Sequence, residues 1–303
     1  MSTGLDAVYQ ELKRLQLEGV ERIFIQDSTL EQLQPEQSPS PQAEISRRAT
    51  PPIDLQSAVQ SSSMPYAPVA KNTPKSTDTA KPPPLPAAPT LELPAGDASS
   101  RMQWLKEQVT SSSVCRGHLR ANEQIVFGEG AIDADIFYCG DAPSEEEATS
   151  GTPFIGKSGE LLSKILKAMG LDRESVYMTN IMKWRPEHHK PYGNRPPTQA
   201  EMNFCLPYLK AQIEIVQPKV IIGLGNATLL GLLGPNPNRK FGAIRGTWQS
   251  FEGTPLIFTF QPSYLLFNDT MKTKRMAWED MLKAMEKVGL PISEKQQGYF
   301  LPK

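Results

Sequence analysis

The chain has 303 residues and a formal net charge of −1, a balance that excludes a uniformly basic nucleic-acid-binding protein but is compatible with a local basic groove. Three cysteines, Cys115, Cys139 and Cys205, lie far apart without a CxxC pair, which excludes a disulfide scaffold and favours reduced intracellular thiols. No apolar run reaches the length of a membrane span, and the N-terminus lacks the apolar core of a signal peptide. The sequence therefore predicts a cytoplasmic protein.

The first hundred residues divide into two segments. Residues 1–33 carry a helical apolar pattern that Gly19 interrupts, and this segment is too short to form a core alone. We expect it to dock on the rest of the chain, with binding to a partner protein as the alternative. Residues 34–100 are rich in Pro, Ser and Ala and contain almost no large apolar side chains. They predict a disordered tether with polyproline character, within which a docking peptide is the alternative.

Residues 101–290 read as a single α/β domain, followed by a C-terminal tail at 291–303. Strand-like apolar runs alternate with amphipathic helical patterns, and Thr198 with Glu201 forms a capping box. This alternation predicts a three-layer domain in which a four-stranded parallel sheet is flanked by helices. The expected strands are 136–139, 176–180, 220–224 and 256–260, with a further short candidate at 125–127; the expected helices are 102–109, 158–169, 198–216, 227–233 and 273–288.

The stretch 134–162 organises the predicted site. A strand runs into the turn 140–144, which holds Asp141, and a flexible acidic segment is expected before the loop 151–156. Ser158 is the expected N-cap of the helix that follows, and Gly170 its stop. In an open parallel sheet the ligand lies beyond the carboxyl ends of the strands. Those ends also carry Asn180, and the sequence contains no metal-binding spacing, phosphate-binding glycine loop or nucleophile elbow.

Four segments together carry a resemblance to a known family. They read GDAPSEEEATSGTPFIGKSGELL, VYMTNIMKWRP with its continuation GNRPPTQAE and CLPYL, KVIIGLGNA, and FTFQPSYLL. Over residues 111–288 the chain resembles the uracil-DNA glycosylase superfamily, most closely family 4, whose bacterial and archaeal members carry a [4Fe–4S] cluster. The resemblance implies a pocket for a flipped base and hydrolytic removal of uracil from DNA in base excision repair, close to the nucleoid.

The resemblance also assigns roles to pocket residues. It implies that Asp141 orients the attacking water, that Phe154 stacks on the flipped base, and that the backbone amide of Ser144 approaches the base. Asn180 would read the uracil edge, because an amide both donates to a carbonyl and accepts from N3–H. The plainer alternatives are a turn-capping Asp or Asn and a core Phe.

One catalytic position departs from the family pattern. Gln261 stands where the family's closing motif has His, so one flexible N–H replaces a rigid ring donor for the anion that develops on uracil. We expect weakened rather than abolished catalysis. Asn194 matches an Asn that helps to place water, although its loop is longer here. Within 263–267, Leu265 and Leu266 are candidates for a wedge between stacked bases, with core packing as an equal alternative.

Basic and polar residues around the pocket are expected to contact the DNA backbone, although solvated surface charge explains each of them equally well. These residues are Lys183, Arg185, Arg195, Ser263, Lys272, Lys274 and Arg275.

The cluster positions of the family fall near Ser112, Cys115, Trp184 and Cys205, so two of the four thiolates are present. Two thiolates do not hold a cubane cluster by themselves. The sequence therefore predicts that the chain binds neither an iron–sulfur cluster nor another metal or cofactor, with Trp184 filling the vacated space.

The main hypothesis is thus a monomeric, monofunctional uracil-DNA glycosylase whose partner is uracil-containing DNA. Two alternatives stay open. The same fold could act on another deaminated base such as hypoxanthine or xanthine, or it could be a non-catalytic DNA-binding module that has lost the cluster ligands and the motif His.

Overall fold

The computed structural model describes residues 85–186 and 195–301. The predictions for residues 1–33, for most of the 34–100 segment and for Asn194 lie outside this described part. None of the described helices is long and apolar enough to pass through a bilayer.

A mixed sheet with the strand order β1-β3-β2-β4-β6-β5 forms the centre of the described part. The inner strands β3 (Tyr177–Asn180), β2 (Ile136–Gly140), β4 (Val220–Leu224) and β6 (Thr254–Thr259) are mutually parallel, which confirms the predicted α/β core. Short antiparallel strands, β1 (Glu129–Gly130) and β5 (Trp248–Phe251), were not predicted and close the two edges. The candidate strand at 125–127 is not a strand.

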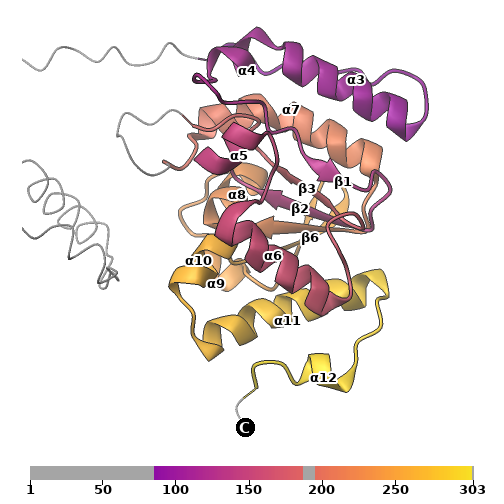
Figure 1. The fold of residues 1–303 in the computed structure, drawn as a ribbon, viewed down its shortest axis with the longest axis vertical. Helices are drawn as coiled ribbons and strands as arrows, with labels where there is room; N and C mark the ends of the chain where they lie inside the picture. The colour runs from indigo at the N-terminus through magenta and orange to yellow at the C-terminus, as the bar shows by residue number, and fades with distance from the viewer. Residues whose placement is uncertain (1–84, 187–194, 302–303) are drawn as a thin grey trace, which may run out of the picture. The chain divides into compact units, whose positions relative to one another are not determined.

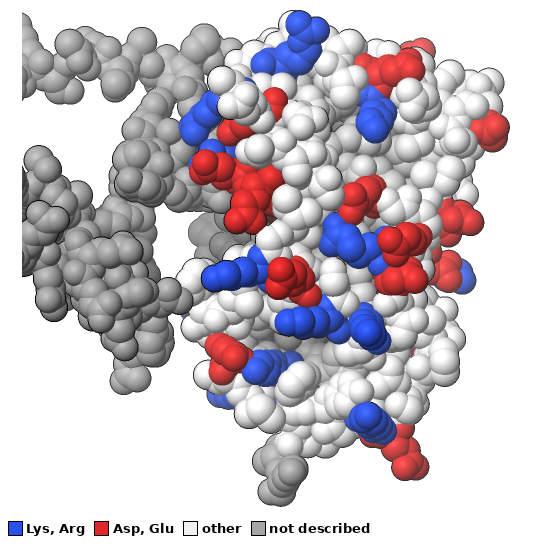
Figure 2. All heavy atoms as spheres, in the orientation of Figure 1, with Lys and Arg blue, Asp and Glu red and all other residues white. Residues whose placement is uncertain are grey.

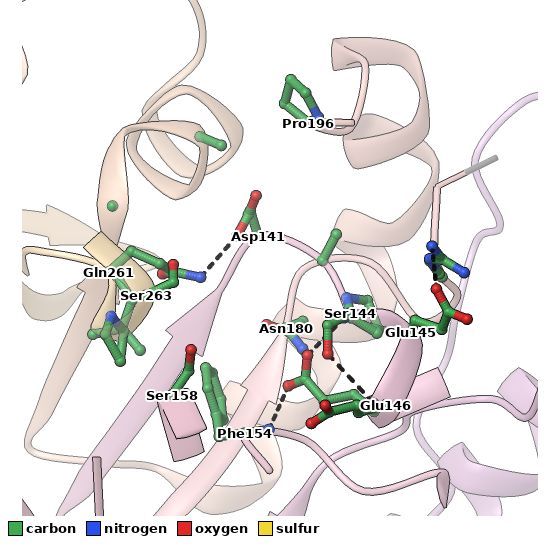
Figure 3. Close-up of a pocket in the computed structure, with 18 of the residues that line it drawn as sticks. Asp141, Ser144, Glu145, Glu146, Phe154, Ser158, Asn180, Pro196, Gln261 and Ser263 are labelled. Carbon is green, nitrogen blue, oxygen red and sulfur yellow. Dashed lines mark hydrogen bonds and ion pairs between the residues drawn. The ribbon is translucent and has the colours of Figure 1, made fainter. Parts of the chain in front are cut away.

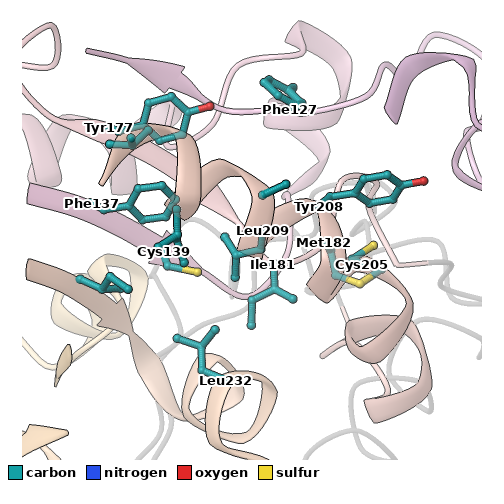
Figure 4. Packing of buried hydrophobic residues seen from close by; sticks show 14 of the residues in the cluster. Phe127, Phe137, Cys139, Tyr177, Ile181, Met182, Cys205, Tyr208, Leu209 and Leu232 are labelled. Carbon is teal, nitrogen blue, oxygen red and sulfur yellow. The ribbon is translucent and has the colours of Figure 1, made fainter. Parts of the chain in front are cut away.

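Helices cover both faces of this sheet. α3 (Ala98–Ser111), α4 (Ser113–Gly117), α7 (Gln199–Val216) and α8 (Gly225–Leu233) lie on one side, and α6 (Gly156–Met169) and α11 (Met271–Val288) lie on the other (Figure 1). Side chains alternate along β2, so Phe137 and Cys139 join the first core and Ile136 and Tyr138 the second. Figure 4 shows part of the first core. Each large apolar side chain buried in this way contributes about 1.5–3 kcal/mol.

Helix boundaries follow the capping chemistry of the chain. The capping box of Thr198 and Glu201 is present at the start of α7, as predicted, and Gly170 ends α6 in the left-handed conformation. Ser158 does not cap α6, because the helix already begins at Gly156 after Ile155. The acidic segment expected to be flexible is the helix α5 (Glu145–Ser150). The other helices of the described residues are α9 (Phe241–Ile244), α10 (Pro262–Phe267) and α12 (Glu294–Gln297).

Both ends of the described part extend the predicted domain. Leu91 and Leu93 pack against the first core, so the expected linker boundary at residue 100 falls too late. At the other end, the tail folds back on α11, where the Trp278 indole N–H donates to the Gln296 carbonyl at 2.6 Å and Tyr299 packs on the same indole. Apolar residues on both sides of the predicted domain thus complete its cores.

Candidate functional site

A cavity of about 760 Å³ opens at the carboxyl edge of the parallel strands. β2 and β3 pair in register with Gly140 opposite Asn180, so the turn after β2 lies beside the end of β3. β4 and β6 supply the remaining wall through the residues that follow them. The side chains that line this cavity include those of Asp141, Phe154, Asn180, Gln261 and Ser263 (Figure 3). The topology therefore gathers the predicted pocket residues into one site.

Asp141 supplies a half-buried carboxyl group just after β2. Its carbonyl accepts from the Met182 N–H at 3.0 Å, which holds the turn against the segment after β3. Burial raises the pKa of Asp141 to about 6. The Gln261 side-chain N–H donates to Asp141 Oδ1 at 3.3 Å (Figure 3). At neutral pH the pocket therefore holds a desolvated carboxylate that accepts a proton more readily than an exposed one.

Two amide groups in the pocket have atoms without a protein partner. Asn180 Nδ2 and Gln261 Oε1 are both buried and make no hydrogen bond within the described residues. A buried unsatisfied polar atom costs about 1–3 kcal/mol, a cost that a ligand with matching groups removes. The pocket thus offers a ligand one free amide donor and one free amide acceptor.

Phe154 forms an apolar wall next to these amides. Its side chain is buried, with its ring close to Gly140, where a Cβ would stand 3.1 Å from the ring and 2.2 Å from Asn180 Oδ1. Glycine at position 140 is therefore what lets the aromatic wall and the amide meet. A flat ring beside an amide with free hydrogen-bonding capacity suits a planar heterocycle.

Ser144 does not offer its backbone amide to the pocket. That N–H donates to Glu147 Oε2 at 2.6 Å, and the Ser144 hydroxyl accepts from the Glu147 N–H, which completes a capping box at the start of α5. The amide predicted to approach a base is thus already bound. Sequence reasoning missed Glu147, which the Ser-x-x-Glu spacing of a capping box could have revealed.

The position of Lys183 contradicts the prediction that this residue contacts the DNA backbone. Its side chain is fully buried, and its ammonium donates at 2.8 Å to Thr179 Oγ1, to the Asn180 carbonyl and to Gln212 Oε1. Burial lowers the pKa of Lys183 to about 8. Because none of this side chain reaches the surface, Lys183 does not contact a phosphate in this arrangement and instead ties the end of β3 to α7.

The two arginines that were expected to bind phosphate both have carboxylate partners. Arg185 is buried and pairs with Glu123 at 3.3 Å and with Glu145 at 3.0 Å. Arg195 lines the cavity and binds both oxygens of Glu201, at 2.6 and 2.8 Å. A phosphate at either position has to compete with a carboxylate already in place.

The three basic residues of α11 differ from one another. Lys272 is exposed, whereas Lys274 forms an ion pair with Asp269. Arg275 pairs with Glu279 at 2.8 Å and donates to the carbonyls of Gln297 and Tyr299, so it also holds the tail. Figure 2 shows acidic and basic side chains interspersed on the face that it draws. Lys272 is the α11 residue most open to DNA.

The positions aligned with cluster ligands lie on the α7 side of the sheet. Cys115 and Cys205 are buried free thiols, and burial together with the nearby Cys115 raises the pKa of Cys205. Trp184 is also buried, and it stacks on His118 with a ring-centroid distance of 4.8 Å. Its indole N–H has no partner among the described residues. The thiols fit as cluster ligands, whereas Trp184 supplies none.

The fold is that of an α/β protein with a cavity beyond the ends of its parallel strands. The amides and the aromatic wall of this cavity suit a planar heterocyclic ligand. Comparison with models of known families identifies the family within this class. The model of the uracil DNA glycosylase superfamily matches residues 127–282, and the chain belongs to that superfamily.

Curated relatives agree with this assignment and favour the type-4 branch. The chain is 39% identical over 186 residues to the type-4 uracil-DNA glycosylase of Thermotoga maritima, covering 60% of this chain and 92% of the relative. It is 34% identical over 211 residues to the same enzyme of Sulfurisphaera tokodaii, covering 66% and 90%. For the Saccharolobus solfataricus enzyme the identity is 36% over 167 residues, covering 52% and 74%.

The prediction that the chain binds no iron–sulfur cluster is wrong. It rests on the spacing of the cysteines alone, while the matched relatives are type-4 enzymes, the branch to which the family resemblance assigns a [4Fe–4S] cluster. Cys115 and Cys205 are the described thiols that would hold such a group. When bound, such a cluster supplies redox or structural chemistry.

Proposed function

We propose that the chain is a monofunctional uracil-DNA glycosylase that hydrolyses the N-glycosidic bond of uracil in DNA. The observation that carries this proposal is the convergence of a half-buried carboxylate with a raised pKa, two partly unpartnered amides and an aromatic wall in one cavity. Membership of the superfamily and the similarity to type-4 enzymes support the same activity. The proposed substrate is uracil-containing DNA, which the chain would meet in the cytoplasm at the nucleoid.

The pocket polar groups match uracil. Asn180 Nδ2 is free to donate to a uracil carbonyl, and the Asn180 side-chain oxygen lies beside it as an acceptor for N3–H. Phe154 supplies the apolar plane that replaces the stacking lost when a base leaves the helix. Cytosine presents an amino group and an unprotonated N3 on this edge, so the same amide binds it poorly.

The reaction needs a water on one side of the sugar and a stabilised anion on the other. In the proposed step the water oxygen bonds to C1′ while the bond from C1′ to uracil N1 breaks, its electron pair leaving with uracil. The water proton passes to Asp141, and the uracil anion later takes a proton from solvent. Desolvation strengthens the pull of the Asp141 carboxylate on the developing sugar cation.

Gln261 would donate a hydrogen bond first to the Asp141 carboxylate and then to the developing uracil anion. In the free protein its N–H donates to Asp141 and fixes the carboxylate. With substrate in place, the same neutral amide is within the pocket wall that faces the base and can donate to uracil O2 as negative charge develops there. One flexible donor with two duties predicts slower chemistry than a dedicated ring donor.

Phe267 is a better candidate than Leu265 for the residue that wedges between stacked bases. Leu265 is buried in the fold, whereas Phe267 lines the cavity at the end of α10 and is 76% exposed. An exposed aromatic at the mouth of a base pocket can fill the gap that a flipped nucleotide leaves. We propose that Phe267 enters the base stack, and that Lys272 contacts the backbone nearby.

The test uses purified protein with labelled single- and double-stranded oligonucleotides that contain uracil, hypoxanthine or xanthine. Alkali cleavage of abasic sites measures base release, and Asp141→Asn runs beside the wild type. Uracil release that disappears in the variant supports the proposal. Release of hypoxanthine or xanthine alone would move the substrate to another base. Salt-sensitive DNA binding without release from any substrate would contradict catalysis and leave a binding module.

A further inference from the structure

The backbone of Phe154 adopts a conformation that a phenylalanine does not choose by itself. Its φ is +53°, in the left-handed region where a side chain with a Cβ is disfavoured. The Phe154 backbone also packs tightly against α6, since a Cβ on Gly159 would stand 1.8 Å from the Phe154 carbonyl oxygen. Something in the surrounding structure must therefore hold this residue in place.

Glu147 provides the first restraint. It is 7% exposed, and its two carboxylate oxygens accept from different backbone N–H groups, Oε2 from Ser144 and Oε1 from Phe154. Ser144 closes the turn that begins with Asp141, so one side chain joins the carboxylate turn to the aromatic loop. Charge-assisted hydrogen bonds of this kind are stronger than neutral ones.

Arg173 provides the second restraint from the opposite side. Its guanidinium donates to the Phe154 carbonyl at 2.9 Å and to the Pro153 carbonyl at 2.8 Å, while an ion pair with Glu129 of β1 anchors the guanidinium. The N–H and the carbonyl of Phe154 are thus both bound by charged side chains. Neither Glu147 nor Arg173 is needed to bind the base directly in the pocket described above.

We infer that Glu147 and Arg173 are positioning residues that clamp Phe154 in the pose in which its ring stacks on the flipped base. This inference rests on the proposed function. Without the clamp, the backbone of Phe154 relaxes toward the β region and its ring moves away from Gly140 and Asn180. A displacement of about 1 Å at a reacting site lowers a rate by about 10²-fold, so the clamp acts on the chemical step and not on DNA affinity.

The decisive experiment is a double-mutant cycle on Glu147 and Phe154. Glu147→Gln keeps the shape but replaces one acceptor oxygen by an NH₂ group that faces a backbone N–H. We expect its single-turnover rate of uracil release to fall by about 10²-fold, with the dissociation constant for uracil-free DNA unchanged. Phe154→Ala should show a similar loss, and the double variant should be little worse than Phe154→Ala alone.

Two further variants refine the cycle. Glu174→Gln is the matched control, because Glu174 is exposed and lies next to Arg173 without touching Phe154 in the described contacts, and it should keep the wild-type rate. Arg173→Lys keeps the charge but loses the fork that binds two carbonyls, so we expect a loss of about tenfold. Glu147→Asp, which keeps the charge but reaches one N–H only, replaces Glu147→Gln if that variant does not fold.

The outcomes separate the clamp from the proposed activity. Additive losses in the double variant, or a wild-type rate for Glu147→Gln, would overturn the clamp while uracil release by the wild type upholds the activity. Hydrogen exchange of the peptide 151–157 tests the clamp without catalysis, and faster exchange is expected in Glu147→Gln but not in Glu174→Gln. Faster exchange in a protein whose wild type releases no uracil would uphold the geometry and reject the activity.

Discussion

The two walls of the pocket are built on opposite principles. On the wall formed by Asp141, Asn180 and Gln261, two amides have atoms without a partner among the described residues, and the carboxyl group has a raised pKa. On the wall formed by Phe154, both backbone polar groups of the aromatic residue are bound by charged side chains. The first wall keeps interaction free energy available for a ligand, whereas the second is rigid before any ligand arrives.

This difference explains how one small site can combine reactivity with shape. A desolvated carboxylate and unsatisfied amides destabilise the fold, and such cost is acceptable where a substrate removes it. A stacking surface contributes only if it does not move, so its supports are fully satisfied. Variants of the polar wall should therefore change the rate of bond cleavage and its pH dependence, and variants of the aromatic wall should change the position of the Phe154 ring.

The largest expected effect comes from removing the charge of the polar wall. Asp141→Asn keeps the size of the side chain and a hydrogen-bonding oxygen for Gln261, but it cannot hold a proton from water or stabilise a sugar cation. We expect the single-turnover rate of uracil release to fall by about 10²–10³-fold or more. DNA binding in a gel-shift or anisotropy assay should stay within about twofold of the wild type. An unchanged rate would remove Asp141 from the chemistry.

A smaller loss is expected at Gln261. Gln261→Ala removes the side-chain donor to Asp141 and the proposed donor to uracil O2, and we expect the rate to fall by about 10–10²-fold. Gln261→His places the ring donor of the family motif at the same position and should restore at least the wild-type rate. A Gln261→Ala protein with full activity would show that the polar wall works without this amide.

The pH dependence of the rate gives a third comparison of the two walls. Since burial raises the pKa of Asp141 to about 6, the carboxylate form is lost as pH falls through that value. Between about pH 6 and pH 5 the wild-type rate should approach a tenfold fall per pH unit, whereas the residual rate of Asp141→Asn should lack this limb. The nearby Glu147 carboxylate also raises the pKa of Asp141, so the profile of Glu147→Gln should be lower throughout and its acid limb should begin at a lower pH.

Sequence patterns predicted the residues of the polar wall because the end of a strand can be recognised from a few neighbouring residues. Apolar runs ending in a Gly-Asp turn or in Asn180 locate strand ends, and parallel pairing brings such ends to one edge of the sheet. The assignment of roles to Asp141 and Asn180 needed the family resemblance as well. The edge strands were missed, since a two-residue strand such as β1 carries no periodic pattern.

The supports of the aromatic wall were not predictable in the same way. Glu147 reads as one of three exposed glutamates, and only its spacing from Ser144 distinguishes it. Lys183 reads as a surface charge beside Arg185, yet it lies fully buried among backbone carbonyls. These contacts depend on which charged side chain turns inward to bind a backbone group, and neither composition nor period contains that choice.

The smallest expected effect is on stability, and it tests the cost of the polar wall. The pKa of Asp141 rises from 3.8 to about 6 on folding, so protonation favours the folded state. This contribution is complete below pH 3.8 and is lost as pH rises through about 6. At pH 7.5 Asp141→Asn should therefore be more stable than the wild type, by an amount of the order of 1–3 kcal/mol.

Thermal unfolding at pH 7.5 and pH 4 measures this effect directly. The melting temperature of Asp141→Asn should exceed that of the wild type at pH 7.5 by several degrees, and the difference should shrink at pH 4, where Asp141 is protonated in the folded protein. Asp133→Asn, at an exposed position, is the matched control and should show no such dependence. An equal or lower melting temperature for Asp141→Asn at pH 7.5 would mean that the polar wall carries its charge without cost to the fold, and the contrast between the two walls would then lie in geometry alone.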